Sequence, residues 1–159
     1  MRWWRTHRAD PEARRIADRH YNRRKVGSPQ FVPPGRCVVL STRDGAVWVT
    51  SWPFGEYVKH RWPGLWVNSL FRNETTHLSS ELILEAVAAT RSIWDPPEGG
   101  LVSFVDPGKT RPKRHPGFCY LKAGFEYDGK TQGGLVALVL RPDRMPPAEA
   151  PLLTQPRLI

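Results

Sequence analysis

Short apolar runs and amphipathic stretches divide the chain into the elements of a mixed α and β domain. Apolar runs typical of strands occupy residues 1–7, 36–41, 46–51, 65–71, 101–105, 125–127 and 135–140. Apolar residues that recur every three or four positions predict helices over residues 11–21 and 79–94, and residues 116–124 suffice for two further turns. The predicted order is strand, helix, two antiparallel strands, strand, helix, strand, short helix and hairpin.

Polar residues and glycines mark the ends of these elements. Asp10 before Pro11 is typical of the N-cap and first position of a helix, and Ser79 or Ser80 is expected to cap the second long helix. The pairs at 128–129 and 133–134 (Asp-Gly and Gly-Gly) predict the turn of the final hairpin.

The chain is long enough for one ordinary domain with a buried core. We expect a single domain over residues 1–141, followed by a proline-rich tail, residues 142–159, that is extended or disordered. Cys37 and Cys119 lie in apolar surroundings without a metal-ligand pattern, which favours two buried thiols. No apolar run approaches the roughly 20 residues that span a membrane, and the start does not resemble a signal peptide. We therefore expect a cytoplasmic protein without a membrane partner.

The charge of the chain indicates a partner. The formal net charge is +9, and residues 1–25 contribute nine Lys or Arg against three acids. A second basic group contains no acid between residues 107 and 125. Arginine-rich surfaces with aromatic neighbours suit phosphate contacts and base stacking, although a solvated basic face is the alternative. The candidate DNA-binding residues are Arg19, Arg23, Arg24, Lys25, Lys109, Arg111, Lys113 and Arg114.

Three residues with acid–base chemistry come close together after residue 105. Asp106 stands at the end of a predicted buried strand, His115 lies in the basic loop, and Tyr120 lies on the short helix. Ligands of open α/β sheets bind at such strand ends, so the three are expected to converge. The alternative is a helix cap, a loop histidine and a packed tyrosine.

The predicted order of elements resembles the GNAT acyltransferase fold, a mixed, centrally parallel sheet flanked by helices with a C-terminal hairpin. Residues 119–126 (CYLKAGFE) are similar to the YxKxGF signature of that superfamily. The resemblance implies that Tyr120 is the general acid toward the departing thiolate of coenzyme A. It departs from the family at residues 72–80 (RNETTHLSS), where GNAT enzymes carry a glycine-rich pyrophosphate loop. Ordinary acyl-CoA binding is therefore not expected.

A narrower resemblance accommodates this departure. Four segments look like motifs of the phage Mom-type DNA modification proteins: 103–107 (SFVDP), 115–117 (HPG), 125–129 (FEYDG) and 72–80. His20 and Tyr21 are similar to an early His-Tyr pair of that family. The resemblance implies a GNAT-like enzyme of a bacterial or phage-infected cell that adds an acyl-type group to N6 of adenine in DNA.

These resemblances imply roles for individual residues. Asp106 would bind or deprotonate the amine, Tyr120 would protonate the leaving group, and His20 or His115 would act as base. The two histidines and Asp106 together also suit iron or zinc. The substrate or donor would be bound by Tyr21, Asn73, Glu74, Ser79, Ser80 and Lys122. The target base would be flipped out of the duplex, with the aromatic stretch 52–62 as one place to receive it.

Two other functions remain open, and a homodimer is compatible with each. An N-acetyltransferase for a small-molecule or protein amine would share the fold but would have to bind acetyl-CoA. A non-catalytic DNA-binding module would use the basic residues alone and would not need Asp106 or Tyr120.

Overall fold

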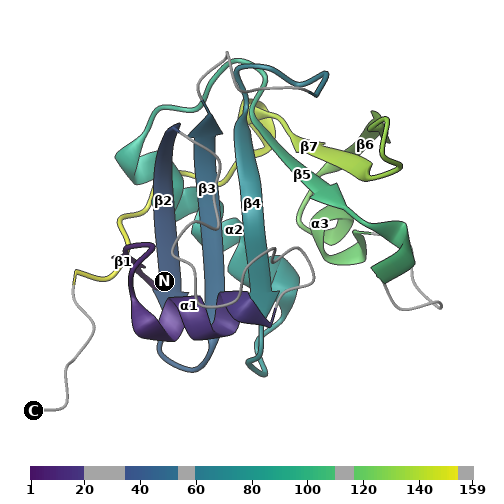
Figure 1. The fold of residues 1–159 in the computed structure, drawn as a ribbon. Coiled ribbons are helices and arrows are strands. Elements are labelled where there is room, and N and C mark those ends of the chain that lie inside the picture. The colour runs from purple at the N-terminus through teal and green to yellow at the C-terminus, as the bar shows by residue number, and fades with distance from the viewer. Residues whose placement is uncertain (20–34, 54–59, 110–116, 154–159) are drawn as a thin grey trace, which may run out of the picture.

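The computed structural model describes residues 1–19, 35–53, 60–109 and 117–153 (Figure 1). Its strands are β1 (Trp3–Thr6), β2 (Gly35–Thr42), β3 (Ala46–Pro53), β4 (Trp66–Asn73), β5 (Leu101–Val105), β6 (Glu126–Lys130) and β7 (Val136–Leu140). Its α-helices are α1 (Pro11–Asp18), α2 (Ser79–Ile93) and α3 (Phe118–Lys122), and its 3-10 turns include η2 (Pro107–Lys109) and η3 (Pro142–Arg144). The predicted order of elements is confirmed.

The described strands form one sheet in the order β1-β2-β3-β4-β5-β7-β6. Among the described strands only β4 and β5 are parallel neighbours, so the fold is mixed α+β with a mostly antiparallel sheet. The expectation of a centrally parallel sheet therefore holds for one pair of strands alone. A parallel neighbour needs a crossover, and α2 supplies it between β4 and β5, whereas the β6–β7 hairpin returns β7 antiparallel beside β5.

Helices and an aromatic cluster cover the two faces of the sheet. The main core lies between the sheet and α2 with α3, while α1 covers the other face of β2, β3 and β4 (Figure 1). Beyond α1 on that second face, Trp62 packs against β4, β5 and β7. Among the described helices, none is long and apolar enough to cross a membrane.

The predicted N-cap is confirmed for α1 and is wrong for α2. Asp10 is the N-cap of α1, and its carboxylate accepts a hydrogen bond of 2.9 Å from the backbone N–H of Glu12. The expected cap of α2 by Ser79 or Ser80 is wrong, because Leu78 is the N-cap. Ser79 instead turns its hydroxyl to the side chain of Asn73, whose Nδ2 donates to it at 3.0 Å.

The C-terminal hairpin is present, but its turn lies farther along the chain than residues 128–129. Tyr127 is opposite Leu138 and Lys130 is opposite Val136, so Asp128 and Gly129 form a bulge within β6. Gly129 has φ of 108°, a conformation that glycine adopts easily, and this keeps the dipeptide in the strand. Residues 131–135 make the turn.

The described part of the proline-rich tail packs on the domain. Met145 is buried in the main core. Farther on, the backbone N–H of Glu149 donates to the carbonyl of Ala88 in α2, and that of Leu152 to the carbonyl of Trp3 in β1. Residues 142–153 thus run back along α2 to the edge strand β1.

Candidate functional site at the parting of β4 and β5

The two parallel strands separate after three paired residues. Residues 66–68 of β4 pair with residues 101–103 of β5, after which β4 stays with β3 and β5 stays with β7. Figure 1 shows the two strands diverging from there. Val49 of β3 is opposite Leu70 and Thr50 is opposite Asn68, so Ser69 is the extra residue of a β-bulge at the parting. A bulge bends its strand and occurs often next to active sites.

Tyr120 of α3 lies at this parting. Its hydroxyl is 2.7 Å from the side-chain amide of Asn68, and the Ser103 hydroxyl is 3.1 Å from the same amide. All three side chains are buried. Polar side chains that are this buried must find most of their hydrogen bonds within the protein, because little water reaches them. The three residues therefore form a defined polar centre between β4, β5 and α3.

Aromatic contacts and one glycine hold Tyr120 there. The ring packs edge-on against Phe125 at 5.2 Å and Phe71 at 6.3 Å between ring centroids. Gly117 is the N-cap of α3 with φ of 77°, and a Cβ at this position would stand 2.1 Å from Leu138 Cδ1. Glycine thus lets the start of α3 lie directly against β7.

Asp106 follows the last residue of β5, as expected. Its Oδ1 accepts a hydrogen bond of 2.9 Å from the backbone N–H of Gly108, and its backbone carbonyl accepts one from Lys109. The carboxylate therefore orders the η2 turn. It is half-buried, three residues beyond Ser103 of the polar centre.

Asn73 organises the loop between β4 and α2. Its Nδ2 donates to the carbonyl of His77 at 2.9 Å and to the hydroxyl of Ser79, while its Oδ1 accepts from the backbone N–H of Thr75 at 2.9 Å. Side-chain hydrogen bonds of this kind stabilise a turn without glycine. The loop after β4 is thus held by its own side chains, and Ser80 lies in the first turn of α2.

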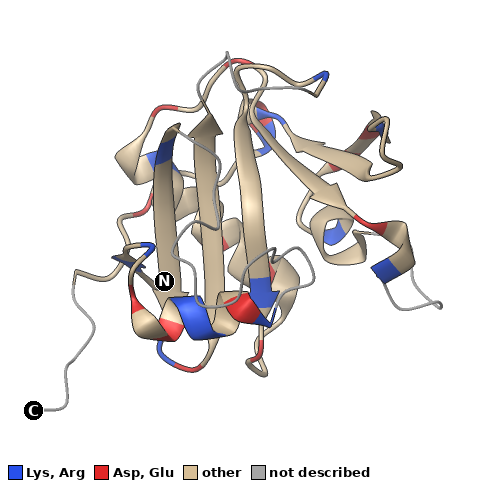
Figure 2. Ribbon diagram, in the orientation of Figure 1, with Lys and Arg blue, Asp and Glu red and all other residues tan. Residues whose placement is uncertain are grey.

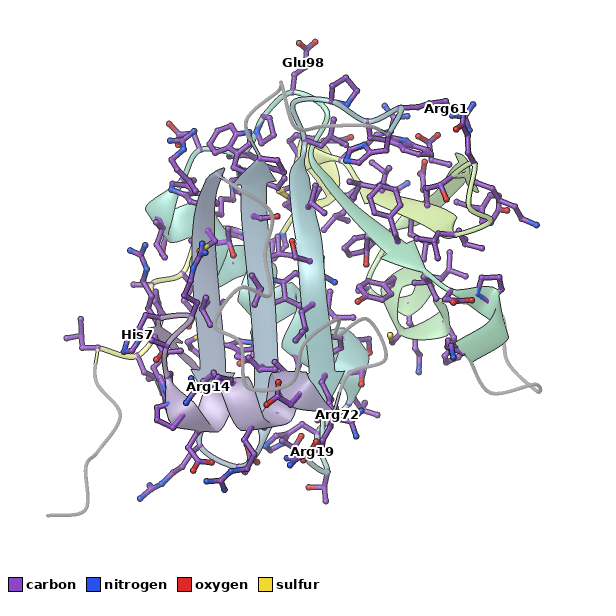
Figure 3. The ribbon with its side chains drawn as sticks, viewed as in Figure 1. His7, Arg14, Arg19, Arg61, Arg72 and Glu98 are labelled. Carbon is purple, nitrogen blue, oxygen red and sulfur yellow. The ribbon has the colours of Figure 1, made fainter. Side chains whose placement is uncertain are left out.

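Glu74 is held by two arginines. Arg19 donates to both of its carboxylate oxygens at 2.7 Å, and Arg72 Nε donates to one of them at 2.6 Å. The hydrogen bond from Arg19, helped by Arg72, lowers the pKa of Glu74 to about 2, and the same bond raises the pKa of Arg19. Figure 3 shows Arg19 and Arg72 together at the end of α1. The negative charge of Glu74 is therefore compensated.

Ion pairs also engage much of the described N-terminal basic segment. Arg2 pairs with Glu85 at 2.7 Å, Arg15 with Glu12 at 3.1 Å, and Arg19 with Glu74. Figure 2 shows acidic and basic positions interspersed along α1. The segment thus offers less uncompensated charge than its composition indicates. Lys109 and Lys122 are exposed; Lys109 lies in η2, which follows β5, and Lys122 lies in α3, the helix that carries Tyr120.

Several predicted site residues lie outside the described part of the chain. They are His20, Tyr21, Arg23, Arg24, Lys25, Arg111, Lys113, Arg114 and His115. Of the three proposed metal ligands only Asp106 is described, and the described residues contain no group of three His, Cys, Asp or Glu placed to hold a metal.

Burial raises the pKa of Cys119, the neighbour of Tyr120, which disfavours its reactive thiolate.

The described part of the aromatic stretch acts as cover. Trp62 is buried on the second face of the sheet, and its Nε1 donates to Asp128 Oδ2 at 2.8 Å. His60 stacks on Phe104 with 5.0 Å between ring centroids, and burial lowers the pKa of His60. Residues 60–62 therefore connect the β6–β7 hairpin to β5, on the face of the sheet opposite Tyr120.

Asn68 is not among the site residues predicted from the sequence, although its position in the chain carries a signal. It stands as the polar residue after Trp66 and Val67 in a run that is otherwise apolar. A buried amide within a central strand requires specific partners, and those partners are on other elements.

Comparison of the chain with protein-family models, with curated proteins and with solved structures finds no match.

Proposed function

We propose that the protein is a transferase with a GNAT-like fold that adds an acyl-type group to the exocyclic N6 amine of adenine in DNA. The order of elements and the parallel β4–β5 pair support the GNAT-like part of this proposal. The proposal depends most on one observation: the hydroxyl of Tyr120 lies within hydrogen-bond distance of the Asn68 amide, at the point where β4 and β5 separate. The bulge at Ser69 opens the sheet beside a proton-carrying group.

The chemistry asks for two proton transfers. An exocyclic amine is a poor nucleophile, since its lone pair is delocalised into the ring, so a base must take one of its protons. The N6–carbon bond forms, the bond between the acyl carbon and its leaving group breaks, and Tyr120 gives its proton to the leaving group. Asp106 at the end of β5 accepts the hydrogen bond of the amine, with His20 or His115 as the further candidate base.

Phosphate contacts would come from the basic residues beside this centre. Lys109 and Lys122 are exposed on η2 and α3, and the predicted contacts at Arg111, Lys113 and Arg114 lie between them in the sequence. The N6 amine of a duplex is inside the base stack, so the adenine must be flipped out to reach Tyr120.

An N-acetyltransferase that uses acetyl-CoA on another amine is the second candidate. The N-terminus of α2 favours it, because no described side chain caps the first backbone N–H groups of that helix. Uncapped N–H groups attract phosphate. Against it, the preceding loop is closed by the hydrogen bonds of Asn73 and has no glycine to admit a pyrophosphate.

Mass spectrometry of nucleosides from DNA co-expressed with the protein tests the proposal. We expect an added adenine derivative with the native protein, its absence with Tyr120→Phe, and its presence with Tyr127→Phe. Tyr127 is the matched control, since its ring is exposed on β6. Native protein that binds DNA without changing any nucleoside would instead indicate a binding module. Unchanged DNA together with micromolar acetyl-CoA affinity would favour the second candidate.

A further inference from the structure

We propose that Asn68 is a positioning residue that fixes the direction of the Tyr120 hydroxyl proton. The role of Asn68 in catalysis rests on the proposed function, whereas the geometry of Asn68 and its hydrogen bonds does not depend on it. Asn68 is 7% exposed and is the last residue of β4 that pairs with β5, next to the bulge.

The neighbours of the Asn68 amide determine its orientation. One side of the amide faces two backbone carbonyls, those of Val49 at 3.2 Å and Leu70 at 2.9 Å. Carbonyl oxygens only accept hydrogen bonds, so Nδ2 must be on that side. Oδ1 then faces the hydroxyls of Ser103 at 3.1 Å and Tyr120 at 2.7 Å. An amide oxygen has no proton to give, so both hydroxyls donate to it.

The same amide joins the bulge to Tyr120. Val49 and Leu70 are paired directly across from each other beside the extra residue Ser69. By donating to both of their carbonyls, Asn68 stabilises the backbone shape that opens the sheet. Turning the amide over would break these two hydrogen bonds and leave buried carbonyls facing Oδ1. The orientation is therefore locked by the strand geometry.

A locked acceptor assigns the role of Tyr120. The hydroxyl keeps its proton to bond Asn68, and its lone pairs face away from the amide. When negative charge develops on a leaving group, the O–H turns from Oδ1 toward it, which exchanges one hydrogen bond for another. The phenolate left behind would face the oxygen of Asn68, so Tyr120 regains its proton readily. The arrangement suits a proton donor and does not suit a base.

Exchange of tyrosine hydroxyl protons, measured by NMR on protein with 13C-labelled tyrosine ring carbons, tests the orientation without any substrate. The chain has four tyrosines, so the Tyr120→Phe variant assigns the signal. We expect the Tyr120 hydroxyl of the native protein to exchange at least about tenfold more slowly than that of exposed Tyr127. Equal rates in the native protein would overturn the proposal, even if no Asn68 variant folds.

Two variants separate positioning from simple packing. Asn68→Ala is expected to raise the exchange rate of the Tyr120 hydroxyl about tenfold, whereas Ser103→Ala removes the other donor and is expected to leave the rate nearly unchanged. For DNA modification, Asn68→Ala is expected to lower kcat about tenfold or more with KM for DNA unchanged. Slow exchange together with an inactive native protein would refute only the proposed function. Active native protein and full kcat in Asn68→Ala would refute positioning.

Discussion

Arg19 and Glu74 form a two-pronged ion pair, with both guanidinium–carboxylate hydrogen bonds at 2.7 Å. The pair joins the end of α1 to the loop after β4. Each residue is a candidate for ligand contact by its place in the sequence, Arg19 for phosphate and Glu74 for substrate or donor. In the folded chain Arg19 and Arg72 share the carboxylate of Glu74, so the negative charge of Glu74 is compensated and the guanidinium of Arg19 is engaged.

The first prediction concerns the acid stability that this pair gives. The pKa of Glu74 is lowered to about 2 from an ordinary 4.5, so its stabilisation is complete above about pH 4.5 and is lost as the pH falls to about 2. Because the pair is partly solvated, we expect Glu74→Gln to lower the free energy of unfolding at neutral pH by roughly 1 kcal/mol. Urea unfolding at several pH values measures the difference, which should shrink toward pH 2.

Glu98→Gln is the control for that experiment, because it removes the same charge at an exposed position far from Arg19 (Figure 3). It should change the free energy of unfolding little at any pH. A loss in Glu74→Gln that is constant across the pH range would show that the ion pair is not its cause.

The second prediction concerns DNA affinity. We expect log K to fall by about 0.9 per contacted phosphate for each decade of salt. Lys122→Ala should reduce that slope by about 0.9, since Lys122 is exposed beside the candidate site. Arg15→Ala is the matched control, because Arg15 is paired with Glu12. Fluorescence anisotropy against salt gives the slopes, and no binding of duplex or single-stranded DNA at low salt would remove the DNA hypothesis.

The third prediction separates the two tasks of Asp106. Asp106→Asn keeps an oxygen for the N–H of Gly108 and removes the negative charge, so it should preserve the η2 turn. Asp106→Ala also removes the acceptor of the η2 turn and should cost about 1 kcal/mol. Both variants should lose DNA modification while they keep DNA affinity. Full activity in Asp106→Asn would exclude its carboxylate from the reaction.

The fourth prediction concerns the seat of α3. Gly117→Ala places a Cβ 2.1 Å from Leu138 Cδ1 and puts alanine at φ of 77°, so it should lower the free energy of unfolding by roughly 2 kcal/mol. Gly134→Ala is the control, with φ of 85° and no atom within 4 Å of the added Cβ. It should cost only the backbone strain, about 1 kcal/mol. Equal thermal shifts in the two variants would mean that α3 does not depend on this close approach.

The fifth prediction concerns the donor. We expect coenzyme A to bind weakly or not at all, because the loop 72–80 has no glycine and is closed by the side chain of Asn73. Calorimetry with acetyl-CoA measures this directly. Micromolar binding that disappears when Ser79 and Ser80 are replaced by bulky residues would favour the acetyltransferase.

Local chemistry in the sequence was enough to predict the elements. Apolar periodicity distinguishes strands from helices, and the Asp10–Pro11 start of α1 follows from groups within a few residues of one another. The same reasoning gave a wrong prediction for the N-cap of α2, because the hydroxyl of Ser79 accepts a hydrogen bond from Asn73 at the end of the preceding strand. Local propensity gives way where a neighbouring element offers a better hydrogen bond.

Only the tertiary structure decided the contents of the site. Asn68 and Tyr120 are 52 residues apart, and Arg19 and Glu74 are 55 apart. The periodicity of apolar residues cannot predict such contacts. They depend on which strands become neighbours and on where the bulge at Ser69 shifts the register. The sequence by itself determined that Tyr120 lies on a short helix after β5. Where β4 and β5 separate, the tertiary structure places its hydroxyl against the amide of Asn68, whose orientation is fixed by two backbone carbonyls.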